Sequence, residues 1–232
     1  MKICGLQKTT LLDYPGHVAA TVFLGGCNFR CPFCHNKELL GNDAEELLSR
    51  EELMDFIQKR ASILEGICIT GGEPALFPEE LESLIRELRS YGLLIKLDTN
   101  GFRPEVLKRL CGEQLLDYVA MDIKTSLRRY PVVAGVPGLD TAGIAESVSF
   151  LMSGNVPYEF RTTVVRELHT ADDFAEIGAW LKGCSAYFLQ NYVESENVLQ
   201  PGFSSYDKQE LLSFAGLLKP YIGRVELRGV DY

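Results

Sequence analysis

Short apolar runs alternate with segments of helical periodicity along most of the chain. The apolar runs are rich in β-branched and aromatic residues, and they predict strands at 18–24, 66–70, 93–98, 118–123, 158–165, 186–192 and 224–227. Between them, apolar residues recur at helical spacing and predict helices at 50–64, 78–91, 104–111, 141–152, 171–182 and 206–219. Strands that alternate with helices are typical of a parallel sheet, so the pattern predicts an α/β fold built from βα units.

Local signals mark the ends of several predicted helices. Ser49 and Glu52 form a capping-box pattern at the start of the first helix. Pro78, followed by two glutamates, suits a first helical turn, and Pro220 ends the last helix. No repeat, low-complexity tract or linker interrupts this order, so we expect a single domain over residues 1–232.

Polar or glycine-rich groups recur at the carboxyl ends of the predicted strands. Gly-Gly-Cys occupies 25–27, Gly-Gly-Glu occupies 71–73, Asp-Thr-Asn-Gly occupies 98–101, and Asp-Ile-Lys occupies 122–124. Loops of any α/β protein begin with polar residues, but their recurrence on six strands favours a shared site. In βα barrels and open parallel sheets, active sites lie at the carboxyl ends of the strands. The sequence therefore predicts a site at this edge of the sheet.

The composition excludes several classes of protein. The chain is 46% apolar and 24% charged, which is ordinary for a globular domain. It has no long uncharged apolar run, so we expect no membrane span. Residues 1–10 lack a signal-peptide pattern, which favours the cytoplasm. With 32 acids against 23 bases, the net charge of −9 disfavours a nucleic-acid partner.

Three of the seven cysteines, Cys27, Cys31 and Cys34, are spaced C-x3-C-x2-C in a loop that directly follows the first predicted strand. A fully coordinated 4Fe–4S cluster uses four cysteines, so three would leave one iron open for catalysis. Zinc bound with His17 or His35 is an alternative, although His35 adjoins Cys34 and His17 lies at the far end of the strand. Three buried thiols without a metal are a further alternative.

The triplet, with Phe33 at the aromatic position of C-x3-C-x-aromatic-C, resembles the signature of the radical S-adenosylmethionine (SAM) enzymes. The stretch TGGEP at 70–74 is similar to the GGE motif of that superfamily. Three further stretches resemble the glycyl-radical-enzyme activating proteins: LQKTTLLDYPG at 6–16, CHN at 34–36 and DTNG at 98–101. Within this group the chain most resembles the activating proteins of anaerobic ribonucleoside-triphosphate reductase, with pyruvate formate-lyase activating enzymes as cousins.

The resemblance implies a partial βα barrel of about six units that holds a 4Fe–4S cluster and SAM. Cys27, Cys31 and Cys34 match the positions that ligate the cluster and serve catalysis. The matching cofactor-binding positions are Phe33, Gly71, Gly72, Glu73, Asp98, Asn100, Lys124, Arg161 and Gln190.

The resemblance also implies individual roles for several of these residues. Residues 71–73 match the segment that lines the SAM amino group, and Lys124 matches a lysine that pairs with the SAM carboxylate. Asp98 matches a position near the amino or ribose end, Arg161 one near the nucleoside, and Phe33 one near the adenine.

Two features of the site stay less defined. Asp98, Thr99 and Asp122 match positions that hold a monovalent cation in a related activator. The pyruvate formate-lyase activators carry a histidine at the end of the sixth strand, where this chain has Gln190 and Asn191. One of these two residues would have to take the place of that histidine.

Other chemically active side chains are expected to be structural. His17 is interpreted as a structural histidine, Trp180 as core, and His169, just before a helix start, as a surface residue. The remaining cysteines are expected to be free thiols: Cys4, Cys68, Cys111 and Cys184.

The reaction implied by the resemblance is reductive cleavage of SAM to a 5′-deoxyadenosyl radical, which abstracts hydrogen from a glycine of a partner glycyl-radical enzyme. The implied partner is anaerobic ribonucleotide reductase, and the electron comes from a low-potential donor such as flavodoxin or ferredoxin. An incomplete barrel without a second cysteine cluster suits a large substrate that closes the site. The alternatives are a pyruvate formate-lyase-type activase, a small-molecule radical SAM enzyme such as a 7-carboxy-7-deazaguanine synthase, and a non-enzymatic metal-binding module.

Overall fold

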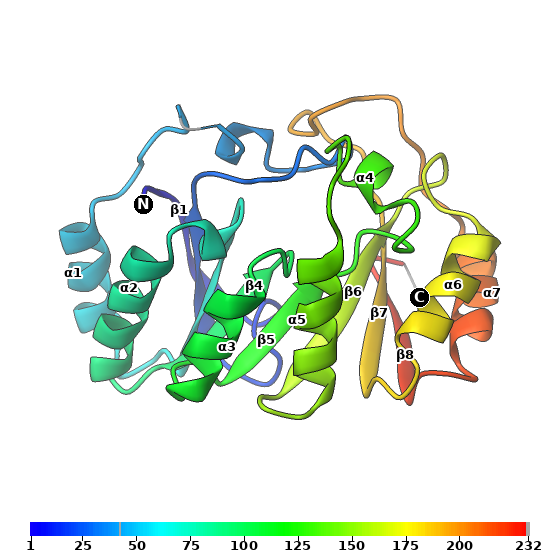
Figure 1. Cartoon of the computed structure of the whole chain (residues 1–232). Coiled ribbons are helices and arrows are strands. Elements are labelled where there is room, and N and C mark those ends of the chain that lie inside the picture. Colours follow the sequence, from blue (N-terminus) through cyan, green and yellow to red (C-terminus); the bar gives the residue numbers. More distant parts are fainter. Residues whose placement is uncertain (42, 231–232) are drawn as a thin grey trace.

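The computed structural model describes residues 1–41 and 43–230, and in this part of the chain eight strands form one sheet whose spatial order equals the chain order (Figure 1). The first two strands, β1 (Ile3–Thr10) and β2 (Ala19–Leu24), are antiparallel. All later neighbours are parallel: β3 (Gly66–Gly71), β4 (Leu94–Thr99), β5 (Tyr118–Asp122), β6 (Tyr158–Val164), β7 (Ala186–Asn191) and β8 (Arg224–Arg228). Within the described residues β1 and β8 do not pair, so the barrel is partial, as predicted.

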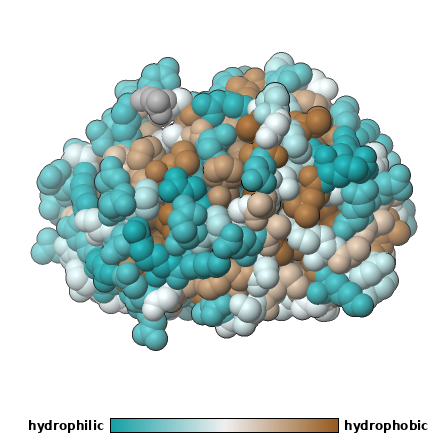
Figure 2. All heavy atoms as spheres, viewed as in Figure 1, coloured by the Kyte–Doolittle hydropathy of each residue, from teal (hydrophilic) through white to brown (hydrophobic). Residues whose placement is uncertain are grey.

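The helices that link successive parallel strands form one layer on the same side of the sheet (Figure 1). They are α1 (Arg50–Arg60), α2 (Pro78–Ser90), α3 (Pro104–Gly112), the short α4 (Tyr130–Val133), α5 (Ala142–Met152), α6 (Ala171–Trp180) and α7 (Lys208–Leu218). Their outer face is mostly hydrophilic, with smaller hydrophobic patches (Figure 2). In the described part of the chain, none of them combines the length and apolar content needed to cross a bilayer.

The seven predicted strands and six predicted helices are confirmed with small shifts of their ends. The predicted capping box of Ser49 and Glu52 is present at α1. Strand β1 was missed because it is an edge strand: Gln7, Lys8 and Thr9 are exposed, so it shows no apolar run. The four-residue helix α4 is too short to show helical periodicity.

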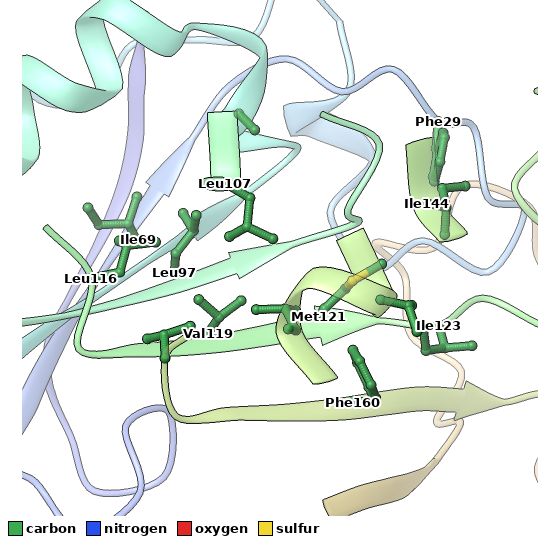
Figure 3. Packing of buried hydrophobic residues seen from close by; sticks show 14 of the residues in the cluster. Phe29, Ile69, Leu97, Leu107, Leu116, Val119, Met121, Ile123, Ile144 and Phe160 are labelled. Atoms are coloured by element: carbon green, nitrogen blue, oxygen red, sulfur yellow. The ribbon is translucent and has the colours of Figure 1, made fainter. Parts of the chain in front are cut away.

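The apolar core lies between the sheet and the helices. Ile69, Leu97 and Val119 extend from three adjacent strands and lie close to Leu107 of α3 (Figure 3). All four side chains are buried. Successive residues of a strand point to opposite faces of the sheet, so the sequence neighbours of Ile69, Leu97 and Val119 point away from the helices. These side chains form the inner face of the sheet, the face turned away from the helices, and the candidate site lies on this face.

Candidate active site

The inner face of the sheet encloses a cavity of about 940 Å³, a volume typical of sites for small organic ligands. Its wall includes all three cysteines of the triplet. It also includes the side chains or backbone of most of the predicted cofactor-binding residues: Phe33, Gly71, Gly72, Asp98, Asn100, Lys124, Arg161 and Gln190. Glu73 is the one predicted site residue that is not part of this wall.

The cysteine loop is held from two sides by backbone hydrogen bonds. The Arg30 N–H donates to the Ala134 carbonyl at 2.9 Å, just after α4. On the other side, the Leu199 N–H donates to the Cys34 carbonyl at 2.9 Å, and the Gln200 N–H donates to the Pro32 carbonyl at 2.8 Å. Segments 134 and 199–200 thus fix the loop although they lie far from it in sequence.

The thiols of the triplet are shielded from water. Burial raises the pKa of Cys27 to about 12 and the pKa of Cys31 to about 11, and it also raises the pKa of Cys34. At neutral pH these thiols are therefore protonated unless a metal binds and displaces the protons.

The histidines do not lie where a mononuclear zinc site would need them. His35 has its Nε2 atom 2.6 Å from the Val193 carbonyl oxygen. His17 has its Nδ1 atom 3.4 Å from Glu65 Oε2, at the start of β2. Within the described residues, no three His, Cys, Asp or Glu side chains are close enough to hold a single ion. Three thiols on one cavity wall fit a larger iron–sulfur group with one iron open to a ligand in the cavity.

Gly71 and Gly72 let the end of β3 pack directly against the cysteine loop. A Cβ atom on Gly72 would lie 2.0 Å from the Gly26 carbonyl oxygen, and one on Gly71 would lie 2.2 Å from the Leu24 carbonyl oxygen. Gly71 also has φ +129°, which side chains disfavour. The glycine pair is therefore required by the chain's own packing, in addition to any approach to a ligand.

Glu73 faces the protein interior. Its carboxylate accepts hydrogen bonds from the backbone N–H of Ala75 at 3.0 Å, the Thr99 hydroxyl at 2.8 Å and the Asn100 N–H at 2.6 Å. Burial raises the pKa of Glu73 to about 7. The resemblance implied a place for residues 71–73 beside the SAM amino group, but the side chain of Glu73 is used to join the ends of β3 and β4.

Five side chains of alternating charge, from β4, from β6 and from the end of β5, lie along the cavity wall. Lys96 pairs with Asp98, whose other oxygen accepts from Arg161 at 2.8 Å. Arg161 also donates to Asp122 at 2.5 Å, and Asp122 pairs with Lys124 at 2.9 Å. Three cations and two anions give this charge ladder a formal charge of +1.

The charge ladder keeps its carboxylates ionised. Although burial alone would raise the pKa of Asp122, Arg161 and Lys124 hold that pKa well below its usual value. Burial would likewise raise the pKa of Asp98, but Arg161 and Lys96 keep it lowered. The net positive charge of the ladder can attract a further carboxylate on a ligand.

Lys96 was not predicted as a site residue from the sequence, and His169 was misplaced. Lys96 is 1% exposed and lines the cavity, and the signal for it was a lysine inside an apolar strand. His169 was expected on the surface, which is wrong: it is fully buried behind the site, because the segment that follows β6 folds back under the end of β5. The predictions for Trp180 and His17 are confirmed: Trp180 packs against the core, and His17 is paired with Glu65.

The choice between Gln190 and Asn191 at the end of β7 stays open, because both line the cavity. Gln190 is exposed. Asn191 donates from Nδ2 to the Tyr206 carbonyl at 3.1 Å, whereas its Oδ1 is buried and has no hydrogen-bond partner among the residues that the structure describes. An unpaired buried acceptor at a cavity wall suits a ligand donor. The free thiols predicted outside the triplet are confirmed: Cys4, Cys68, Cys111 and Cys184.

Comparisons with known proteins show the family to which this chain belongs. The profile of the radical SAM superfamily matches residues 21–179. A protein of Methanocaldococcus jannaschii, provisionally named a glycyl-radical enzyme activating enzyme, is 30% identical over 240 residues, covering 99% of this chain and 96% of the relative. The 7-carboxy-7-deazaguanine synthase of Hyperthermus butylicus is 41% identical over 91 residues, or 39% of this chain and 38% of the relative.

A solved structure shares the fold. Streptococcus suis SuiB bound to S-adenosylmethionine superposes with a TM-score of 0.66 at 10% identity, covering 89% of this chain and 51% of that one. At this level of identity the likeness extends to the fold alone.

Proposed function

We propose that this chain, which belongs to the radical SAM superfamily, removes a hydrogen atom from a glycine residue of a partner enzyme and thereby converts it to its glycyl-radical form. We favour anaerobic ribonucleoside-triphosphate reductase as the partner, with a low-potential donor such as flavodoxin or ferredoxin supplying the electron. The similarity along the whole chain to a named activating enzyme supports this proposal.

The chain is a radical SAM enzyme, and its cofactors are a 4Fe–4S cluster and SAM. When bound, the pair supplies reductive cleavage of SAM and a carbon-centred radical that abstracts hydrogen. In the proposal, Cys27, Cys31 and Cys34 hold the cluster by their thiolates. The side-chain ammonium of Lys124 would pair with the SAM carboxylate, and Asp122, which lies 2.9 Å from that ammonium, would hold it in place. Closure of the cavity by the partner would keep water away from the reacting atoms.

The apolar rim of the cavity is the observation that supports a protein substrate most directly. Leu11 and Leu12, at the end of β1, line the cavity and are 69% and 88% exposed. Val193, after β7, lines it as well and is 63% exposed. Exposed apolar side chains that gather at the mouth of a site mark interaction surfaces. A chain segment of a partner would cover these side chains and exclude water while its glycine reaches the cavity.

The local similarity to a 7-carboxy-7-deazaguanine synthase favours a second candidate, a radical SAM enzyme that acts on a small molecule. That similarity covers 39% of the chain. The two candidates differ in what stimulates SAM cleavage: a protein in the first, a metabolite in the second.

The test is anaerobic reconstitution with iron and sulfide, followed by incubation with SAM, a reductant and anaerobic ribonucleotide reductase. We expect about four irons per chain and a SAM-dependent glycyl radical on the reductase, detected by electron paramagnetic resonance. A reductase with its radical-forming glycine changed to alanine is the control. Cleavage of SAM stimulated by a deazaguanine precursor, with no radical on any protein, would support the second candidate instead.

A further inference from the structure

His169 is a fully buried histidine that lies behind the cavity, between the end of β5 and the start of α6. The Val165 N–H donates to its Nδ1 atom at 3.0 Å. Nδ1 also lies 3.2 Å from the Val165 carbonyl oxygen. Because Nε2 faces a carbonyl oxygen, which can only accept, the hydrogen of the neutral ring is on Nε2, and Nδ1 is the acceptor. Nε2 lies 2.7 Å from the carbonyl oxygen of Lys124 and donates to it. Burial lowers the pKa of His169, which agrees with a neutral ring.

The backbone of Lys124 depends on such side chains because β5 ends two residues earlier, at Asp122. The Lys124 N–H donates to the Tyr130 hydroxyl at 3.0 Å, and that hydroxyl donates to the Asp122 carbonyl at 3.2 Å. The backbone N–H and the carbonyl of Lys124 thus both bond to buried side chains, the N–H to Tyr130 and the carbonyl to His169. These two hydrogen bonds fix the orientation of the Lys124 backbone and therefore the direction in which its side chain extends.

The same two rings support the cysteine loop. Phe33 lies edge-on to His169, with ring centroids 6.4 Å apart, and Phe29 lies edge-on to Tyr130, also at 6.4 Å. His169 therefore contacts both the loop that carries the cysteines and the segment that carries Lys124. A shift of this ring would change the position of the ammonium group relative to the thiols.

The rest of this segment is fastened separately. Thr125 and Ser126 donate to Asp173 of α6 at 3.4 Å and 3.2 Å, and Arg129 pairs with the same carboxylate at 2.5 Å. The contact made by His169 is thus local to the Lys124 carbonyl, and its loss should leave the course of the segment intact.

Building on the role proposed above for Lys124, we infer that His169 is a positioning residue: it fixes the Lys124 carbonyl so that the ammonium group meets the SAM carboxylate. Two variants separate its two hydrogen bonds. His169→Asn keeps an oxygen near the Nδ1 position, so it can still accept from Val165, but it cannot reach Lys124. His169→Gln places an N–H near the Nε2 position and can still donate to Lys124.

The experiment measures the dissociation constant of SAM by equilibrium dialysis on the reconstituted protein, together with iron content and melting temperature. We expect His169→Asn to retain its iron and to bind SAM about tenfold more weakly, because small misplacements of a binding group are costly. His169→Gln should bind within about threefold of the wild type. Lys124→Met should weaken binding at least as much as His169→Asn.

Tyr206→Phe is the matched control. The Tyr206 hydroxyl donates to the backbone carbonyl of His169 at 2.6 Å, so its loss loosens the same segment without touching the ring. We expect a lower melting temperature and unchanged SAM affinity. If His169→Asn fails to load iron, Tyr130→Phe tests the same peptide from its N–H side and should also weaken SAM binding.

Wild-type affinity in His169→Asn or Lys124→Met would overturn the inference, and so would an equal loss of affinity in Tyr206→Phe. Binding is measured without a protein partner. If the proposed activase function is wrong, the wild type should still bind SAM normally but form no glycyl radical. The comparison of SAM affinities among the variants would then remain valid.

Discussion

The carboxylate of Glu73 accepts a hydrogen bond of 2.6 Å from the backbone N–H of Asn100, and this bond joins the ends of β3 and β4 beside the cavity. Asn100 in turn donates from Nδ2 to Asn28 Oδ1 at 2.8 Å, within the cysteine loop. A buried acid thus links three of the loops that form the site. Its protonation state should be visible in the stability of the protein.

Stability should depend on pH through Glu73. Burial raises its pKa from the ordinary glutamate value of 4.5 to about 7 in the folded protein. Between about pH 4.5 and 7, the folded state binds a proton that the unfolded chain has lost, so the free energy of unfolding falls as the pH rises. As the pH rises from about 4.5 to 7.5, the free energy of unfolding of Glu73→Gln should increase by up to about 3 kcal/mol relative to that of the wild type. Urea unfolding at several pH values measures this difference, and parallel curves for the two proteins would contradict it.

Loss of one cysteine of the triplet should abolish the chemistry and spare the fold. In Cys31→Ala we expect loss of iron and no formation of 5′-deoxyadenosine from SAM, because a cluster needs all three thiolates. The far-ultraviolet circular dichroism should stay close to that of the wild type. Cys111→Ala, on α3, is the control and should retain iron and activity. Full SAM cleavage by Cys31→Ala would refute the assignment of the triplet.

The apolar rim should matter for a protein substrate and not for SAM. Leu12 is 88% exposed, so Leu12→Asp should leave the stability nearly unchanged. We expect the KM for the partner enzyme to rise at least about tenfold, because a charge would have to be buried under the docked segment. Cleavage of SAM without the partner should not change. Leu47→Asp, at a position 62% exposed and outside the cavity wall, is the matched control. Equal effects of the two variants would argue against docking at this rim.

Removal of Arg161, the central cation of the charge ladder, should destabilise the folded protein. Arg161→Met leaves Asp98 and Asp122 facing each other without the guanidinium that they share. Breaking a largely buried ion pair by removing one partner destabilises by about 3–5 kcal/mol, so urea unfolding should show a loss of this size. Arg161→Lys should rescue only part of it, because an ammonium cannot serve two carboxylates in a planar fork. Arg128→Met, which breaks an exposed pair with Glu176, should change stability little. A small effect of Arg161→Met would show that the ladder is not a coupled unit.

The parts of this protein that could be predicted from its sequence are those encoded over short distances. Short apolar runs indicated seven of the eight strands in the described part of the chain, and the capping box indicated the start of α1. The spacing of Cys27, Cys31 and Cys34 indicated a cluster site for the same reason, since a loop of eight residues carries the whole motif. The strand-end residues Asp98 and Lys124 were expected at one edge because parallel strands end on the same side.

The remaining features depend on which segments meet in space. Strand β1 has three exposed residues in succession, and only its pairing with β2 makes it a strand. Glu73 faces inward, where Thr99 and Asn100, distant in the sequence, donate hydrogen bonds to its carboxylate. His169 can be buried because a carbonyl distant in the sequence, that of Lys124, accepts a hydrogen bond from its ring. Periodicity reports which face of an element is apolar, but the register between elements decides which polar groups find partners, and that register is a property of the folded chain as a whole.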